Sequence, residues 1–131
     1  SSFSSYKIEY LRAKIVEKVF LEISINKEIK VWWENKDVLL ELKDHGIVKT
    51  TNNCNDATLV ILDNKNNFTP ECENKYIFVL KYNLLSDIQS SFGAFFWKKG
   101  RPNIVIIEPR IKSQSINISE DLQEYLEEQV W

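Results

Sequence analysis

The chain has 131 residues, 44% of them hydrophobic and 27% charged, which is typical of a globular protein and long enough for one domain with its own core. Its net charge is −2, and its 14 Lys outnumber its 3 Arg, which argues against a dedicated nucleic-acid binder. No apolar run exceeds five residues, so we expect no direct membrane insertion.

Methionine is absent from the chain, also at position 1. We therefore expect either a mature protein that has lost a signal peptide or a part excised from a longer protein. The composition shows no linker or repeat, so we expect a single α/β domain over residues 1–131. Within it, residues 1–5 would form a flexible N-terminal remnant.

The first half of the chain predicts two helices and three strands. Residues 5–25 have apolar side chains at helical spacing, and Ser4 or Ser5 can cap the helix start. Residues 29–33 are β-branched or aromatic and predict a strand. Asn35 caps a second helix that Gly46 closes. Two strands are expected next, at residues 47–50 and 58–63.

The second half predicts a strand at residues 75–82, a short helical or irregular piece at 83–91, and two strands at 93–99 and 102–108. Residues 110–115 suit a turn or two of helix. A final helix is expected over residues 119–130, with Glu120 and Asp121 in its first turn, where the helix dipole favours acidic groups.

Early strands alternate with helices, and the last two strands form a hairpin. This order predicts an α/β fold: a three-layer, mostly parallel sheet with an antiparallel hairpin at one edge and helices on both faces.

The two cysteines, Cys54 and Cys72, precede the strands at 58–63 and 75–82. If these strands are parallel neighbours, about 4.8 Å apart, both thiols leave the sheet at the same end, within the Cα separation of a disulfide. We expect a Cys54–Cys72 disulfide and therefore an oxidising compartment, most simply a bacterial periplasm. The alternative is a pair of unrelated buried thiols.

The stretch Lys98-Lys99-Gly100-Arg101 separates the last two strands. A phosphate-binding loop would lead into a helix with free N–H groups, whereas this turn leads into Pro102 and a strand. We interpret it as a hairpin in which Gly100 supplies the positive φ. Its basic residues are either simply solvated or contact a partner, and Trp97, Lys98, Lys99 and Arg101 are our candidate partner-binding residues.

Catalytic and metal sites lack their usual residues. His45 is the only histidine and no CxxC occurs, so we expect no metal, no cofactor and no enzyme activity. Glu34, Asp63 and Lys81 each end a strand and partly match the phosphate-accepting site of response-regulator receivers. That site needs an acidic pair, where this chain has Glu34-Asn35.

Aromatic side chains gather in two strands of the expected sheet. Trp32 and Trp33 should point to opposite faces of one strand. A set made of Trp33, Phe95, Phe96 and Trp97 either packs in the core or lines a pocket.

The C-terminal third resembles the YfiR-like family of small bacterial periplasmic proteins. The matching residues are Gly93, Phe95, 98–101, 104–107, Ile111, Ile118, Ser119 and Leu122. The resemblance implies a non-catalytic periplasmic α/β protein, often disulfide-containing and dimeric, that regulates a membrane-bound signalling protein by binding it. The cysteine positions do not match those of the family. The alternatives are a ligand-sensing domain of a membrane receptor and a receiver-like phosphotransfer domain.

Overall fold

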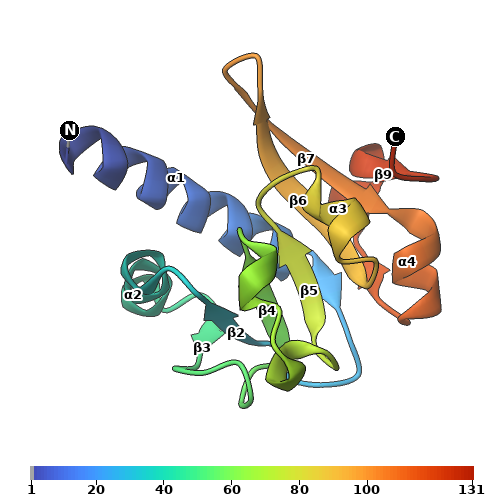
Figure 1. Cartoon of the computed structure of the whole chain (residues 1–131), viewed down its shortest axis with the longest axis horizontal. Coiled ribbons are helices and arrows are strands. Elements are labelled where there is room, and N and C mark those ends of the chain that lie inside the picture. The colour runs from blue at the N-terminus through green and yellow to red at the C-terminus, as the bar shows by residue number, and fades with distance from the viewer. Residues whose placement is uncertain (1) are drawn as a thin grey trace.

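A seven-stranded mixed sheet forms the centre of the fold (Figure 1). The computed structural model describes the backbone of residues 2–131 and the side chains of residues 8–131. The strand order is β3-β2-β4-β5-β6-β7-β9. The strands are β2 (Lys30–Trp33), β3 (Lys49–Thr50), β4 (Leu59–Leu62), β5 (Tyr76–Val79), β6 (Ser91–Lys98), β7 (Arg101–Ile107) and β9 (Leu126–Glu127).

The sheet is parallel from β3 to β6, and β7 pairs antiparallel with β6. The predicted mostly parallel sheet with an antiparallel hairpin is therefore confirmed. Outside the hairpin, β9 adds two residues that run parallel to β7. A separate two-stranded sheet pairs β1 (Ile23–Ser24) with β8 (Asn117–Ile118).

Helices lie on both sides of the sheet, as expected. The α-helices are α1 (Ser2–Leu21), α2 (Lys36–His45), α3 (Leu84–Asp87) and α4 (Glu108–Ser113), and the 3₁₀-helices are η1 (Lys65–Asn67), η2 (Pro70–Cys72) and η3 (Glu120–Tyr125). No helix in the described part of the chain combines the length and apolarity needed to cross a bilayer.

Alternating residues of the central strands bury their side chains in two separate cores. On one face, Leu59 and Ile61 of β4 join the apolar side chains of α1 and α2. On the other, Val60 and Leu62 join those of α3 and the two cysteines. Successive side chains of a strand point to opposite faces of the sheet, so the apolar run 59–62 contributes two side chains to each core.

Two sequence-based helix assignments differ from the structure at the chain ends. The first helix spans Ser2–Leu21, so the predicted helical end at residue 25 is wrong, because Ile23 and Ser24 form β1 and pair with β8. Residues 2–5 of the expected flexible remnant are helical, since that stretch holds no Gly or Pro to break a helix. Position 1 lies outside the described residues. The predicted final helix at 119–130 is wrong. It is the 3₁₀-helix η3 followed by β9, because Leu126 is extended and pairs with Ile106 of β7.

Gly93 allows β6 and β7 to approach closely. A Cβ at this position would lie 2.7 Å from the backbone oxygen of Val105, closer than real Cβ atoms come to backbone. We therefore expect Gly93→Ala to lower the free energy of unfolding by about 1–3 kcal/mol through overpacking, measured by chemical denaturation.

Gly100→Ala is a comparison variant in which overpacking is absent. Its added Cβ meets nothing within 4 Å, but an L-residue at φ +75° is strained, so its loss of about 1 kcal/mol measures backbone strain alone. A Gly93→Ala protein as stable as the wild type would show that β7 moves away without cost.

Candidate functional site

The β6–β7 hairpin ends in a two-residue turn formed by Lys99 and Gly100. Lys98 and Arg101 form the last cross-strand pair. Both turn residues have positive φ, 52° at Lys99 and 75° at Gly100, which is the backbone of a type I′ turn. The predicted hairpin is confirmed, and its turn places a lysine where asparagine or glycine is more usual.

The hairpin tip carries the four predicted partner-binding residues into solvent. Trp97 is 41% exposed, and Lys98, Lys99 and Arg101 are exposed. None of the ion pairs found among residues 8–131 involves these three cations. The tip therefore presents three positive charges, none of them in one of these ion pairs, next to an indole.

A groove of about 700 Å³ lies beside the hairpin, between β7 and the C-terminal segment. Two predicted residues, Trp97 and Lys98, line it. The other lining residues are Tyr82, Phe96, Asn103, Ile104, Val105, Glu124, Tyr125, Glu127 and Trp131. The structure therefore joins the hairpin to an aromatic surface that runs from Trp97 toward the C-terminal segment.

The C-terminal segment is held against this groove by Tyr82. The Trp131 backbone N–H donates to the Tyr82 hydroxyl at 2.7 Å, and the Tyr82 ring packs edge-on against Phe96 at 5.2 Å between centroids. The sequence analysis did not identify Tyr82, Tyr125 or Trp131 as part of a site. It predicted a helix at residues 119–130, whereas this segment forms η3 and β9 and pairs with β7. Of the predicted aromatic set, Trp33 and Phe95 are core residues, and Phe96 and Trp97 line the groove.

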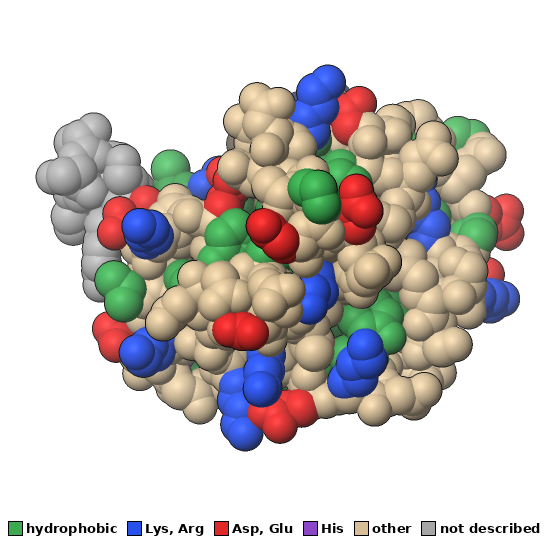
Figure 2. All heavy atoms as spheres, turned by 60° about the horizontal axis from the view of Figure 1, so that its bottom comes forward, with side chains coloured by type: hydrophobic (Ala, Val, Ile, Leu, Met, Phe, Trp, Pro, Cys, Tyr) green, Lys and Arg blue, Asp and Glu red, His purple; other side chains and the backbone are tan. Residues whose placement is uncertain are grey.

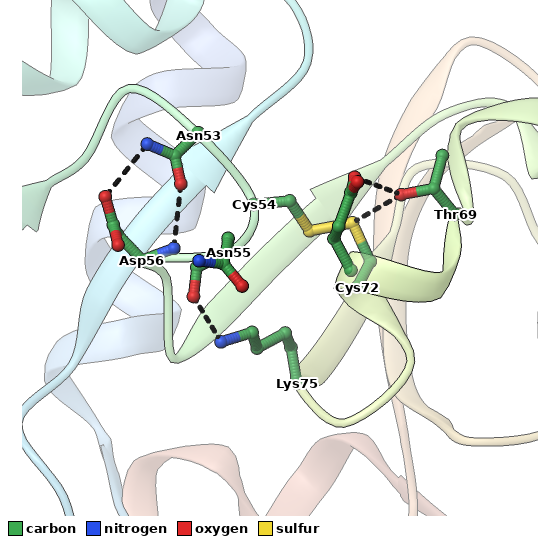
Figure 3. Close-up of a disulfide and its surroundings, with 8 residues drawn as sticks. Asn53, Cys54, Asn55, Asp56, Thr69, Cys72 and Lys75 are labelled. Atoms are coloured by element: carbon green, nitrogen blue, oxygen red, sulfur yellow. Dashed lines mark hydrogen bonds between the residues drawn. A yellow bond between two sulfur atoms is a disulfide. The ribbon is translucent and has the colours of Figure 1, made fainter.

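The predicted disulfide is present at the opposite end of the sheet (Figure 3). Cys54 and Cys72 are bonded, with their Cα atoms 5.6 Å apart. They precede β4 and β5, which are parallel neighbours, as the prediction required. The Thr69 hydroxyl lies 3.6 Å from the Cys72 sulfur, and Lys75 Nζ donates to the Asn55 carbonyl at 2.7 Å.

The surface seen in Figure 2, with the bottom of Figure 1 turned forward, shows Lys or Arg side chains interspersed with Asp and Glu. Apolar side chains appear there as scattered single patches. Outside its grey atoms, this view thus shows a mixed, solvated surface with no field of one sign. The hairpin tip, by contrast, brings an exposed Trp97 together with three exposed cations.

Glu34, Asp63 and Lys81 meet at the carboxyl ends of β2, β4 and β5. Glu34 Oε1 accepts a hydrogen bond from the Asp63 N–H at 2.9 Å. Burial, together with the contact with Asp63, raises the pKa of Glu34 to about 7, and Lys81 opposes that rise. These three predicted residues are therefore close together.

A receiver-like magnesium site is nevertheless incomplete here. Asn35 stands where the second acid would be, and its side-chain oxygen accepts from the N–H groups of Asp37 and Val38 at 3.0 and 3.3 Å. It is thus the N-cap of α2. No group of three or more His, Cys, Asp or Glu among the described residues is arranged to hold a metal ion.

His45 bridges two helices. Its Nδ1 contacts Glu17 Oε1 of α1, and its Nε2 lies 3.2 Å from Glu41 Oε2 of α2. The Tyr10 ring packs edge-on against the imidazole at 5.6 Å between centroids. This arrangement connects α1 to α2 and places no nucleophile beside the imidazole.

Comparison of the chain with models of protein families, with curated proteins and with solved structures finds no match.

Proposed function

We propose that this protein is a non-catalytic binding module that regulates a membrane-bound signalling protein by contacting it through the β6–β7 hairpin. The observation that supports this most is the hairpin tip, where Trp97 and three cations project into solvent, and where none of the cations takes part in an ion pair found among residues 8–131. Tryptophan and arginine are the residues most enriched among those that dominate binding energy at protein interfaces.

The hairpin is also suitably rigid for such a role. Its base is part of the central sheet, where β6 pairs with both β5 and β7, and Phe95 packs in the core. Trp97 rests edge-on against Phe95 at 5.8 Å between ring centroids. A side chain that is exposed yet already oriented loses little conformational entropy on binding.

The proposed compartment is extracytoplasmic, most simply a bacterial periplasm. The Cys54–Cys72 disulfide supports this, because stable intramolecular disulfides persist mainly in oxidising compartments. The resemblance of the C-terminal third to YfiR-like proteins supports the same location and a membrane-bound partner. A homodimer would be consistent with that resemblance.

The groove favours a second candidate, a ligand-sensing domain of a membrane receptor. Its volume of about 700 Å³ lies within the usual range of small-molecule sites, and such sites are rich in aromatic side chains with a few polar groups. A screen of small molecules by Trp fluorescence would separate the two candidates, since Trp97 and Trp131 both line the groove.

We expect Lys98→Glu/Lys99→Glu to weaken binding to the partner at least tenfold without changing the melting temperature. The two substitutions reverse the charge at an exposed tip that makes no ion pair among the described residues. They should therefore lower the affinity for the partner and leave the stability of the free protein unchanged. The measurement is crosslinking capture from envelopes of the host, followed by titration of the captured protein.

Lys36→Glu/Lys43→Glu is the matched control, because it makes the same charge change at two exposed positions of α2. It should leave the affinity within about twofold of the wild type, the expectation for a remote surface charge. Equal binding by the tip variant and the wild type would exclude the hairpin as the contact surface.

A further inference from the structure

The groove beside the hairpin is rich in aromatic rings that keep part of their surface free. Trp131 is 77% exposed and Trp97 is 41% exposed, and the other three rings are half-buried. The face of an aromatic ring carries partial negative charge, so rings that are open to solvent attract cations as well as apolar groups. The aromatic residues of the groove are Tyr82, Phe96, Trp97, Tyr125 and Trp131.

Two carboxylates, Glu124 and Glu127, line the same groove. Both are exposed, and they lie in the segment that runs from η3 into β9. Neither takes part in an ion pair found among residues 8–131. Glu127 Oε2 lies 3.5 Å from the indole Nε1 of Trp131, so this negative charge stands beside one of the rings. Carboxylates next to aromatic rings favour a cation over a neutral or an anionic molecule.

The lysine of the groove, Lys98, belongs to its other end. Lys98 pairs with Arg101 at the start of β7, whereas Glu127 pairs with Ile107 at the end of that strand. The two positions on β7 are separated by about 20 Å of extended backbone. Exposed charges at such a distance are screened, because the Debye length is about 8 Å at physiological ionic strength. The groove thus has a cationic end at the hairpin tip and an anionic, aromatic end at β9.

The anionic end is held in place by contacts within the protein. The Trp131 N–H donates to the Tyr82 hydroxyl at 2.7 Å, and the Tyr82 ring packs against Phe96. The pairing of Leu126 with Ile106 fixes β9 to the sheet. Rings and carboxylates that are already oriented lose little conformational freedom when a ligand binds.

We propose that the β9 end of this groove binds a small organic cation whose charge is carried by an alkylated ammonium group. The alkyl groups pack on the rings, and the positive charge faces Glu124 and Glu127. An alkylated ammonium suits an aromatic site better than a primary one, because it gives up fewer hydrogen bonds to water on binding. The inference rests on the second candidate function, the ligand-sensing domain, and names its ligand class. It is independent of the protein contact proposed for the hairpin tip.

The test is a titration of the full chain with choline chloride at constant ionic strength, followed through the indole N–H signals in ¹H–¹⁵N NMR spectra. We expect a saturable shift of the Trp131 signal with a dissociation constant of about 1 mM. The signal of Trp33, which is 1% exposed in the core, should stay in place. The alcohol 3,3-dimethylbutan-1-ol has the shape of choline without its charge and should bind at least about tenfold more weakly.

Glu124→Gln/Glu127→Gln should weaken choline binding about tenfold, because it removes both negative charges and keeps the size of the side chains. Glu71→Gln/Glu73→Gln is the matched control, since it makes the same charge change at two exposed glutamates outside the groove. It should leave the affinity within about twofold of the wild type.

A Trp131 signal that choline does not shift would overturn the proposal. Equal binding of choline and its neutral analogue, or unchanged binding by Glu124→Gln/Glu127→Gln, would do the same. If choline fails but a neutral molecule from the fluorescence screen binds, the organic-cation class is excluded and the ligand-sensing candidate stands. If neither binds, both are excluded. Capture of the partner by the hairpin tip is measured separately, so its result changes none of these outcomes.

Discussion

Replacing His45 with alanine is expected to lower the free energy of unfolding by about 3–5 kcal/mol, the cost of leaving one partner of a buried ion pair alone. Glu17 is only 3% exposed, and its Oε1 contacts His45 Nδ1. Without the imidazole, this carboxyl group stays between α1 and α2 with neither water nor a hydrogen-bond donor from His45. The measurement is equilibrium denaturation in urea at pH 7.

Two further variants separate the orphaned carboxyl from simple loss of packing. Glu41→Gln removes the other, more exposed partner of His45 and should cost less than about 1 kcal/mol, as surface ion pairs do. Glu17→Leu/His45→Leu removes both polar groups and should be more stable than His45→Ala, because no unpaired acid remains. A His45→Ala protein within 1 kcal/mol of the wild type would show that Glu17 finds water or another donor.

Sequence patterns predicted the features of this fold that depend on local order. The four apolar residues of Leu59–Leu62 indicated a strand covered on both sides, and all four are buried. Asn35 and Gly46 marked the ends of α2, and both caps are formed. In each case the residues that cause the structure lie within one short segment, so the sequence of that segment is sufficient to predict it.

Features that depend on pairing between distant segments were not predictable in this way. Ile23 and Ile118 pair as β1 and β8, although Ile23 belongs to the stretch 5–25 with helical spacing and Ile118 directly precedes the predicted final helix. Leu126 follows an acidic, helix-like first turn, yet it joins β7 as an extended residue. The aromatic groove depends on this return, so its C-terminal half was missed.

The same reasoning explains the outcome for the strand-end residues. The end positions of Glu34, Asp63 and Lys81 could be read from the sequence, and parallel pairing brings them together. Whether their carboxyl groups touch depends on side-chain conformation and burial, which no local pattern encodes. The contact between Glu17 and His45, 28 positions apart, is unpredictable for the same reason.

The disulfide connects the amino ends of β4 and β5, and its removal is the other change with a large expected effect. Cys54 and Cys72 are 7% and 1% exposed and belong to the core shared with α3. Their bond closes a loop across 18 positions. Chain-entropy arguments assign about 3 kcal/mol of stabilisation to a loop of this size, through restriction of the unfolded chain.

Cys54→Ala/Cys72→Ala should therefore lower the free energy of unfolding by about 3 kcal/mol, measured by denaturation beside the wild type with and without reductant. Reduced wild type should match the alanine variant to within about 1 kcal/mol, since both lack the bond. A loss below 1 kcal/mol in both would show that the strand pairing of β4 and β5 restrains this region without the bridge.

The position of the bridge also predicts what its removal leaves intact. It lies at the amino ends of the parallel strands, whereas the β6–β7 hairpin projects from their carboxyl ends (Figure 1). At a temperature where the alanine variant remains folded, its affinity for the captured partner should stay within about twofold of the wild type, since distant sites are usually independent. Thiol titration of protein extracted without reductant should find no free cysteine, and two free thiols there would remove the main support for an extracytoplasmic location.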